Sequence, residues 1–73
     1  EANVVLMYKI KTELSEEFFK TNLLDEGLIM EFFYFCSEDE NFVIRCNGKS
    51  QIDIWLFLEE KYDEFKSNLN SKD

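Results

Sequence analysis

The 73-residue sequence contains no histidine and no proline, only two glycines and two cysteines, and half as many basic as acidic residues. Without histidine, the chain lacks the usual general base, the commonest metal ligand and a member of most nucleophilic triads. Cys36 and Cys46 do not have the C-x-x-C spacing of a zinc or redox site. We therefore expect no enzyme, no catalytic residue, no metal site and no cofactor.

The two glycines, Gly27 and Gly48, stand alone, so the chain has no glycine-rich loop for phosphate. The segment 47–50 (NGKS) ends like a P-loop, but the earlier glycine of that motif is missing. The acidic segment 38–41 lacks the alternating ligands, central glycine and distal glutamate of an EF-hand, so we interpret it as a solvated hairpin turn. Because the chain also has no linker and no repeat, we expect one domain, 1–73.

Long apolar runs are missing as well. No run approaches the roughly 20 residues that a membrane-spanning helix needs, and no basic start followed by an apolar stretch marks a secretory signal. Two cysteines are few for a stapled extracellular miniprotein, so reduced thiols are the better interpretation of Cys36 and Cys46. We expect a cytoplasmic protein that does not bind membranes.

Sixteen acidic and eight basic residues give a formal net charge of −8. Binding to the nucleic-acid backbone depends mainly on Lys and Arg, and anionic membranes attract the same residues, so the charge argues against both as direct partners. Long-range attraction favours a basic protein instead.

Aromatic residues are plentiful, with eight Phe, three Tyr and one Trp, so the chain can build a core. The clearest element is a helix at 51–69, with Ser50 as its N-cap and Asp53 in its first turn. The alternative for Gln51–Leu56 is a strand paired to 42–46 across the Asn47-Gly48 turn. The helix is favoured by an apolar stripe with steps of three and four residues: Trp55, Leu58, Tyr62, Phe65 and Leu69.

Alternating apolar residues elsewhere predict strands. Together these elements define an α+β fold of order β-α-β-β-α, in which two helices cover one face of a three-stranded sheet. Ser15 is the expected N-cap of the first helix. The expected elements are a strand at 3–11, a helix at 15–25, strands at 28–37 and 42–46, a helix at 51–69 and a frayed tail at 70–73.

The strand expected at 28–37 is apolar on both faces, whereas a two-layer domain covers only one face of its sheet. Met30, Phe32 and Tyr34 would then lie on a bare face. A structural domain that forms a homodimer through this face is therefore the alternative functional hypothesis.

Acidic residues cluster on the last helix and in the 38–41 segment. Glu59/Asp63 and Glu60/Glu64 are like-charge pairs four residues apart, about 5–6 Å at Cβ, which is of the order of phosphate spacing along a nucleic-acid strand. The first functional hypothesis is a small acidic inhibitor, of phage or viral type, that binds a nucleic-acid-handling host protein, by mimicry of nucleic acid. The alternative explanation of these charges is a solvated, solubilising surface.

Phe57 falls among the acidic residues of the last helix, away from its apolar stripe. Either another part of the fold covers it, or it is singly exposed, or it anchors a partner inside a charged rim. Under the inhibitor hypothesis, the residues that bind the partner are Asp53, Phe57, Glu60, Glu64, Glu38, Asp39 and Glu40.

Overall fold

The computed structural model describes residues 2–71, and over that range it contains helices and no strand. The α+β fold expected from the sequence is therefore wrong, and so are the strands expected at 3–11, 28–37 and 42–46. The elements are α1 (Ala2–Thr21), the short 3-10 helix η1 (Glu26–Leu28), α2 (Ile29–Ser37), α3 (Phe42–Cys46) and α4 (Gln51–Asn70).

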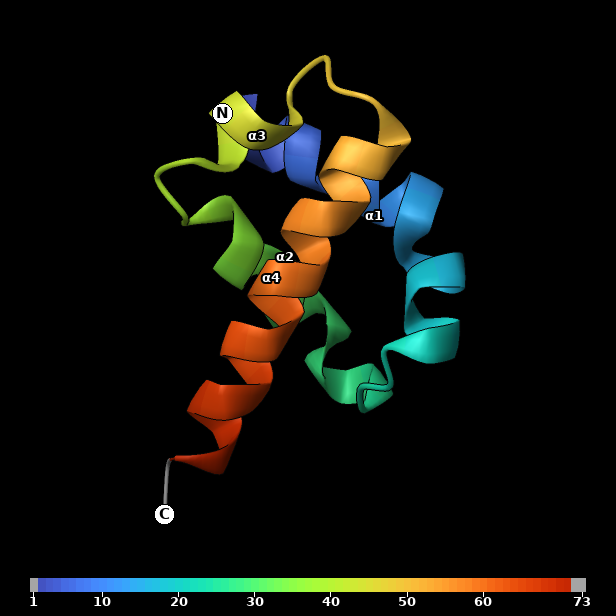
Figure 1. Cartoon of the computed structure of the whole chain (residues 1–73), viewed down its shortest axis with the longest axis vertical. Coiled ribbons are helices and arrows are strands. Elements are labelled where there is room, and N and C mark those ends of the chain that lie inside the picture. Colours follow the sequence, from blue (N-terminus) through green and yellow to red (C-terminus); the bar gives the residue numbers. More distant parts are fainter. Residues whose placement is uncertain (1, 72–73) are drawn as a thin grey trace.

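The helix α2 lies at the centre of the molecule, where it packs against both α1 and α4 (Figure 1). α4 passes in front of α2 in this view, and its last turns project beyond the other helices. The short helix α3 packs on α4 and lies beside the start of α1. The segment 38–41 therefore joins two helices and is not the hairpin turn expected from the sequence.

α1 forms because one apolar stripe runs along it without a break. Met7, Ile10, Leu14 and Phe18 step by three, four and four residues, and all are buried. The alternation that predicted a strand at 3–11 leaves Val4 and Tyr8 exposed, so only the helical period matches the burial. Ser15 lies inside this helix and is not its N-cap.

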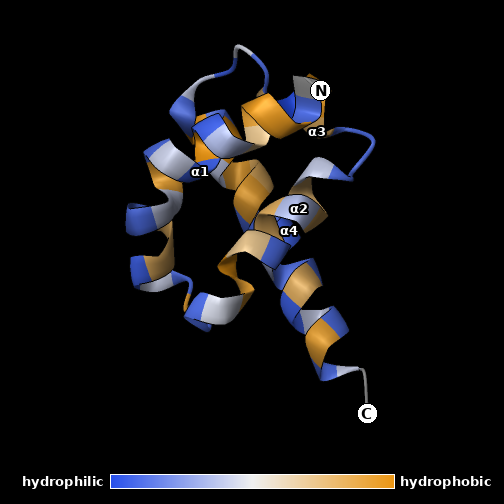
Figure 2. Cartoon of the chain, turned by 180° about the vertical axis from the view of Figure 1, so that it is seen from behind, coloured by the Kyte–Doolittle hydropathy of each residue, from blue (hydrophilic) through white to orange (hydrophobic). Residues whose placement is uncertain are grey.

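α2 is apolar around most of its circumference, as the hydropathy colouring of Figure 2 shows. An element of this kind is stable only when neighbours cover it on several sides. The ring of Phe32 lies 6.0 Å from that of Phe18 on α1 and 5.6 Å from that of Phe65 on α4. Tertiary packing between two long helices thus accounts for the short helix at 29–37.

α4 confirms the predicted helix, and the alternative strand at 51–56 is wrong. The Ser50 hydroxyl accepts a hydrogen bond of 3.2 Å from the Asp53 N–H, as expected of an N-cap. Leu58 and Phe65 of the predicted stripe are buried, and the rest of the stripe packs at the edge of the core. The helix continues to Asn70, so the tail predicted for 70–73 is helical at its first residue, and 72–73 lie outside the described residues.

Gly48 allows the chain to turn from α3 into α4. Its φ of +71° is the only positive φ within residues 2–71, and a Cβ placed there would meet no atom within 4 Å. The substitution Gly48→Ala is therefore expected to lower the free energy of unfolding by about 1 kcal/mol, through backbone strain alone. Urea denaturation checks this value.

Gly27→Ala is the matched control, because its added Cβ would make an ordinary contact of 3.8 Å with Asp25 and its φ is not positive. This variant is expected to be neutral or slightly stabilising, because alanine restricts the unfolded chain. Equal losses in the two variants would contradict the strain assigned to Gly48.

Candidate partner-binding surface

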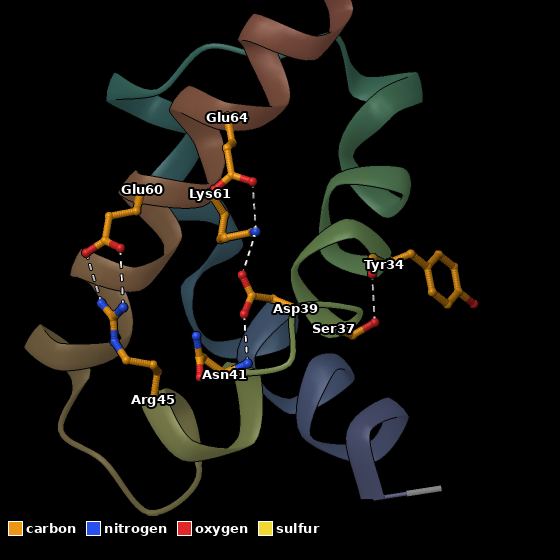
Figure 3. A network of polar contacts seen from close by, with 8 residues as sticks. All are labelled: Tyr34, Ser37, Asp39, Asn41, Arg45, Glu60, Lys61 and Glu64. Carbon is orange, nitrogen blue, oxygen red and sulfur yellow. Dashed lines mark hydrogen bonds and ion pairs between the residues drawn. The ribbon is translucent and has the colours of Figure 1, made fainter.

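Glu60 is the first of the predicted binding residues, and it is already paired. Its two carboxylate oxygens accept hydrogen bonds of 3.2 and 2.9 Å from the Arg45 guanidinium, so the pair is bidentate and ties α3 to α4 (Figure 3). The hydrogen bond with Arg45 lowers the pKa of Glu60, and it raises the pKa of Arg45.

Lys61 forms ion pairs with two more of the predicted binding residues, Asp39 and Glu64. Lys61 is buried, and its ammonium donates hydrogen bonds of 2.7 Å to Asp39 and 3.2 Å to Glu64 (Figure 3). The ammonium also lies 4.5 Å from the centre of the Phe35 ring. The second oxygen of Asp39 accepts a 2.7 Å bond from the Asn41 N–H. These bonds, that with Lys61 above all, lower the pKa of Asp39. Lys61 therefore fixes the 38–41 segment against α4.

The acidic residues thus divide into a paired and an unpaired group. The paired group is Asp39, Glu60 and Glu64. Within residues 2–71, exposed acids without an ion pair include Glu38, Glu40 and Asp53 of the predicted set, and also Glu59 and Asp63.

The ion pairs offset the repulsion in only one of the two like-charge pairs on α4. The repulsion expected between Glu60 and Glu64 is offset by Arg45 and Lys61, whereas that between Glu59 and Asp63 is not. Only the second pair presents uncompensated charge to a partner.

Phe57 is 1% exposed, so its prediction as a partner anchor is wrong. Its ring lies 6.0 Å from that of Phe42, and the Arg45 guanidinium lies 5.2 Å from its centre. α3 therefore covers Phe57, which confirms the interpretation that another part of the fold buries it. The ion pair between Arg45 and Glu60 lies next to the Phe57 ring, on the solvent side of the core.

Met30, Phe32 and Tyr34 do not share one bare face, and the self-association site predicted there is wrong. Phe32 is fully buried, Met30 is partly buried at the edge of the core, and Tyr34 is exposed with its hydroxyl 3.5 Å from that of Tyr8. The prediction depended on the side chains of a strand, where every second residue points the same way. On a helix, these residues point in different directions.

Exposed apolar residues lie at several other places on the surface, and three of them lie at the α3–α4 corner. Ile44, Ile52 and Leu56 are 69%, 73% and 51% exposed. Ile44 and Leu56 line one shallow hollow, together with Arg45, Lys49 and Asp53. Sequence reasoning missed these residues, although the helical wheel that set Phe57 apart also places Ile52 and Leu56 outside the apolar stripe.

Both cysteines are free thiols and are buried. Burial raises the pKa of Cys36 far above its usual range and that of Cys46 to about 11. Since the thiolate is the reactive form, both are inert at neutral pH. Over residues 2–71, no three side chains of the metal-ligating types His, Cys, Asp and Glu come together. None of the described helices combines the length and apolar character required to cross a membrane.

The chain matches no protein-family model, no curated protein and no solved structure. On α4, this small helical domain presents unpaired acids beside exposed apolar side chains.

Proposed function

We propose that this chain is a small, acidic, non-enzymatic interaction module that binds and inhibits a basic protein. The unpaired, exposed acids carry the proposal, because they are free to meet Lys and Arg of a partner without breaking an internal ion pair. The net charge of −8 would speed the encounter with such a partner at low salt.

The candidate partner is a protein whose own ligand is nucleic acid, as in the phage or viral inhibitor hypothesis. Mimicry in its original form placed Asp39, Glu60 and Glu64 among the phosphate substitutes. These three are committed to Arg45 and Lys61. We now assign this role to those unpaired acids that lie on α4 and in the 38–41 segment.

Capture of proteins from a lysate on the immobilised chain, with salt-graded elution, tests the proposal. A variant that neutralises four unpaired acids should lose the captured proteins at lower salt than the wild type, and duplex DNA should compete with capture. The fold should be unchanged, since none of the four acids forms an ion pair with another residue of the described range. The variant is Glu38→Gln/Glu40→Gln/Glu59→Gln/Asp63→Asn.

A matched control removes four exposed acids from α1, η1 and α2 that have no ion pair within the described part of the chain, so that the net charge changes equally. It should retain capture if the site is local. Equal loss in the two variants would show an effect of net charge alone, and retention in both would overturn the proposal. The control is Glu13→Gln/Glu16→Gln/Glu26→Gln/Glu31→Gln.

A further inference from the structure

The outward face of α4 carries a continuous stripe that changes from apolar to acidic along the helix. At 100° per residue, Ile52, Leu56, Glu59 and Asp63 fall within an arc of about 60°. All four are exposed, and the arc lies opposite the side of the helix that is buried. The stripe spans about 16 Å at 1.5 Å per residue, which is three turns of a helix.

Ile44 of α3 widens the apolar end of this stripe. With Leu56 it lines the shallow hollow at the α3–α4 corner, so an incoming apolar side chain would contact both helices. Monomeric proteins usually scatter exposed apolar residues singly, and a cluster rimmed by charges marks an interaction site.

We propose that one helical segment of a basic protein binds to a surface that we call the docking stripe. The docking stripe consists of Ile44, Ile52, Leu56, Glu59 and Asp63. That segment carries apolar side chains over one turn and Lys or Arg over the next turn or two. The inference rests on the proposed function and deepens it, because it supplies the apolar anchor that Phe57 does not provide.

Charge fixes both the kind of occupant and its orientation. Glu59 and Asp63 have no ion pair with another described residue, so they are available to two basic side chains. At the apolar end, Lys49 and Asp53 both line the hollow and their charges offset each other, so this end has no net charge to attract basic residues. The partner's charges must therefore lie toward the C-terminal end of α4, beyond its apolar residues.

A second copy of this chain fits the docking stripe poorly. A parallel pair of α4 helices would set the acids of one copy against those of the other, and like charges at such spacing repel. An antiparallel pair would keep them apart, but would leave about one turn of apolar contact. A basic helix satisfies both halves of the docking stripe at once.

Synthetic fluorescent helical peptides provide the test, with binding to the full chain followed by anisotropy at low salt. One peptide carries two Leu four residues apart and then two Lys, at the spacing of the docking stripe, and a second carries the same residues in reverse order. At least one should bind saturably, and it should shift the methyl NMR signals of Ile44, Ile52 and Leu56. A version with Glu in place of Lys should bind at least about tenfold more weakly.

Two pairs of substitutions on the protein locate the contact. Ile52→Ser/Leu56→Ser and, separately, Glu59→Lys/Asp63→Lys should each weaken peptide binding at least about tenfold. Val5→Ser/Leu23→Ser is the matched control, because these side chains are 69% and 70% exposed and lie outside the docking stripe. It should bind as the wild type does, and circular dichroism should show all variants folded.

The outcomes separate this inference from the proposed function. If the serine variant keeps wild-type capture of lysate proteins and peptide binding while the charge variants lose them, the docking stripe is wrong and the acidic module stands. If neither peptide binds saturably, the inference is overturned. It is also overturned if sedimentation shows a wild-type dimer that the serine substitutions dissociate, because the stripe would then join two copies.

Discussion

Replacing Phe57 with alanine is expected to lower the free energy of unfolding by about 3–5 kcal/mol, as for other large-to-small changes of a buried aromatic. The ring is enclosed by Phe42 and by the Arg45 guanidinium, so its removal leaves a cavity that α3, a helix of five residues, cannot fill. Small domains have a total stability of about 5–15 kcal/mol, so this single change threatens the fold. Urea or thermal denaturation gives the value.

The adjacent substitution, Leu56→Ala, is the control. Leu56 is half exposed, so its truncation is expected to change stability by about 0.5 kcal/mol or less. Two neighbours on α4 should therefore show opposite phenotypes, loss of stability at Phe57 and loss of partner binding at Leu56. A Phe57→Ala chain with wild-type stability and impaired binding would restore Phe57 as a partner anchor.

α4 could be predicted from the sequence because several local signals agree. Ser50 supplies a cap, and the apolar residues from Trp55 onward fit only a helical period.

In α1, the segment 3–11 fits two periods. Val4, Leu6, Tyr8 and Ile10 alternate, whereas Met7 and Ile10 step by three toward Leu14. Extending the pattern to Leu14 and Phe18, past Ser15, which was expected to begin a new helix, decides for the helix.

The segment 28–37 could not be assigned in the same way. A short run that is apolar on all sides is compatible with a buried strand or with a buried helix, and periodicity does not distinguish them. The outcome depends on what surrounds it. Here α1 and α4 pack against it, and it forms a helix. The self-association site was predicted from the side-chain directions of a strand, so that prediction is wrong as well.

The candidate site was predictable in composition but not in pairing. The sequence shows acidic residues on α4, yet Arg45 and Glu60 are 15 residues apart, and Asp39 and Lys61 are 22 apart. Their pairing depends on how α3 and the 38–41 segment pack on α4. The same packing buries Phe57, which the helical wheel of α4 alone places away from the apolar stripe.

The buried position of Lys61 predicts the second large effect. The substitution Lys61→Met retains most of the apolar stem but removes the hydrogen bonds to Asp39 and Glu64 and the contact with the Phe35 ring. Charge-assisted bonds of this kind contribute more than neutral ones. We expect a loss of about 2–3 kcal/mol near neutral pH; it stays below that of a fully buried ion because Asp39 keeps its bond from the Asn41 N–H.

The loss of stability in Lys61→Met should depend on pH. Protonation of Asp39 determines the change at acidic pH, and deprotonation of Lys61 determines it at alkaline pH. The pKa of Asp39 is lowered in the folded chain, by its hydrogen bond with Lys61 first. The stabilisation is therefore complete above the ordinary aspartate pKa of about 4 and disappears as the pH falls through the lowered value. For Lys61, burial alone would lower the pKa, but its bonds with Asp39 and Glu64 outweigh burial and raise it. The stabilisation disappears again as the pH rises through that raised value.

The difference in stability between the wild type and Lys61→Met should therefore be largest around neutral pH and become smaller toward both extremes. Urea denaturation of the two proteins across the acidic range measures the first of these slopes. Lys20→Met is the control: Lys20 is exposed and, among residues 2–71, pairs only with Glu17, so its loss should have no measurable effect at any pH. A Lys61→Met difference that stayed constant as the pH fell would mean that Asp39 and Lys61 do not form the folded-state ion pair that fixes the 38–41 segment to α4.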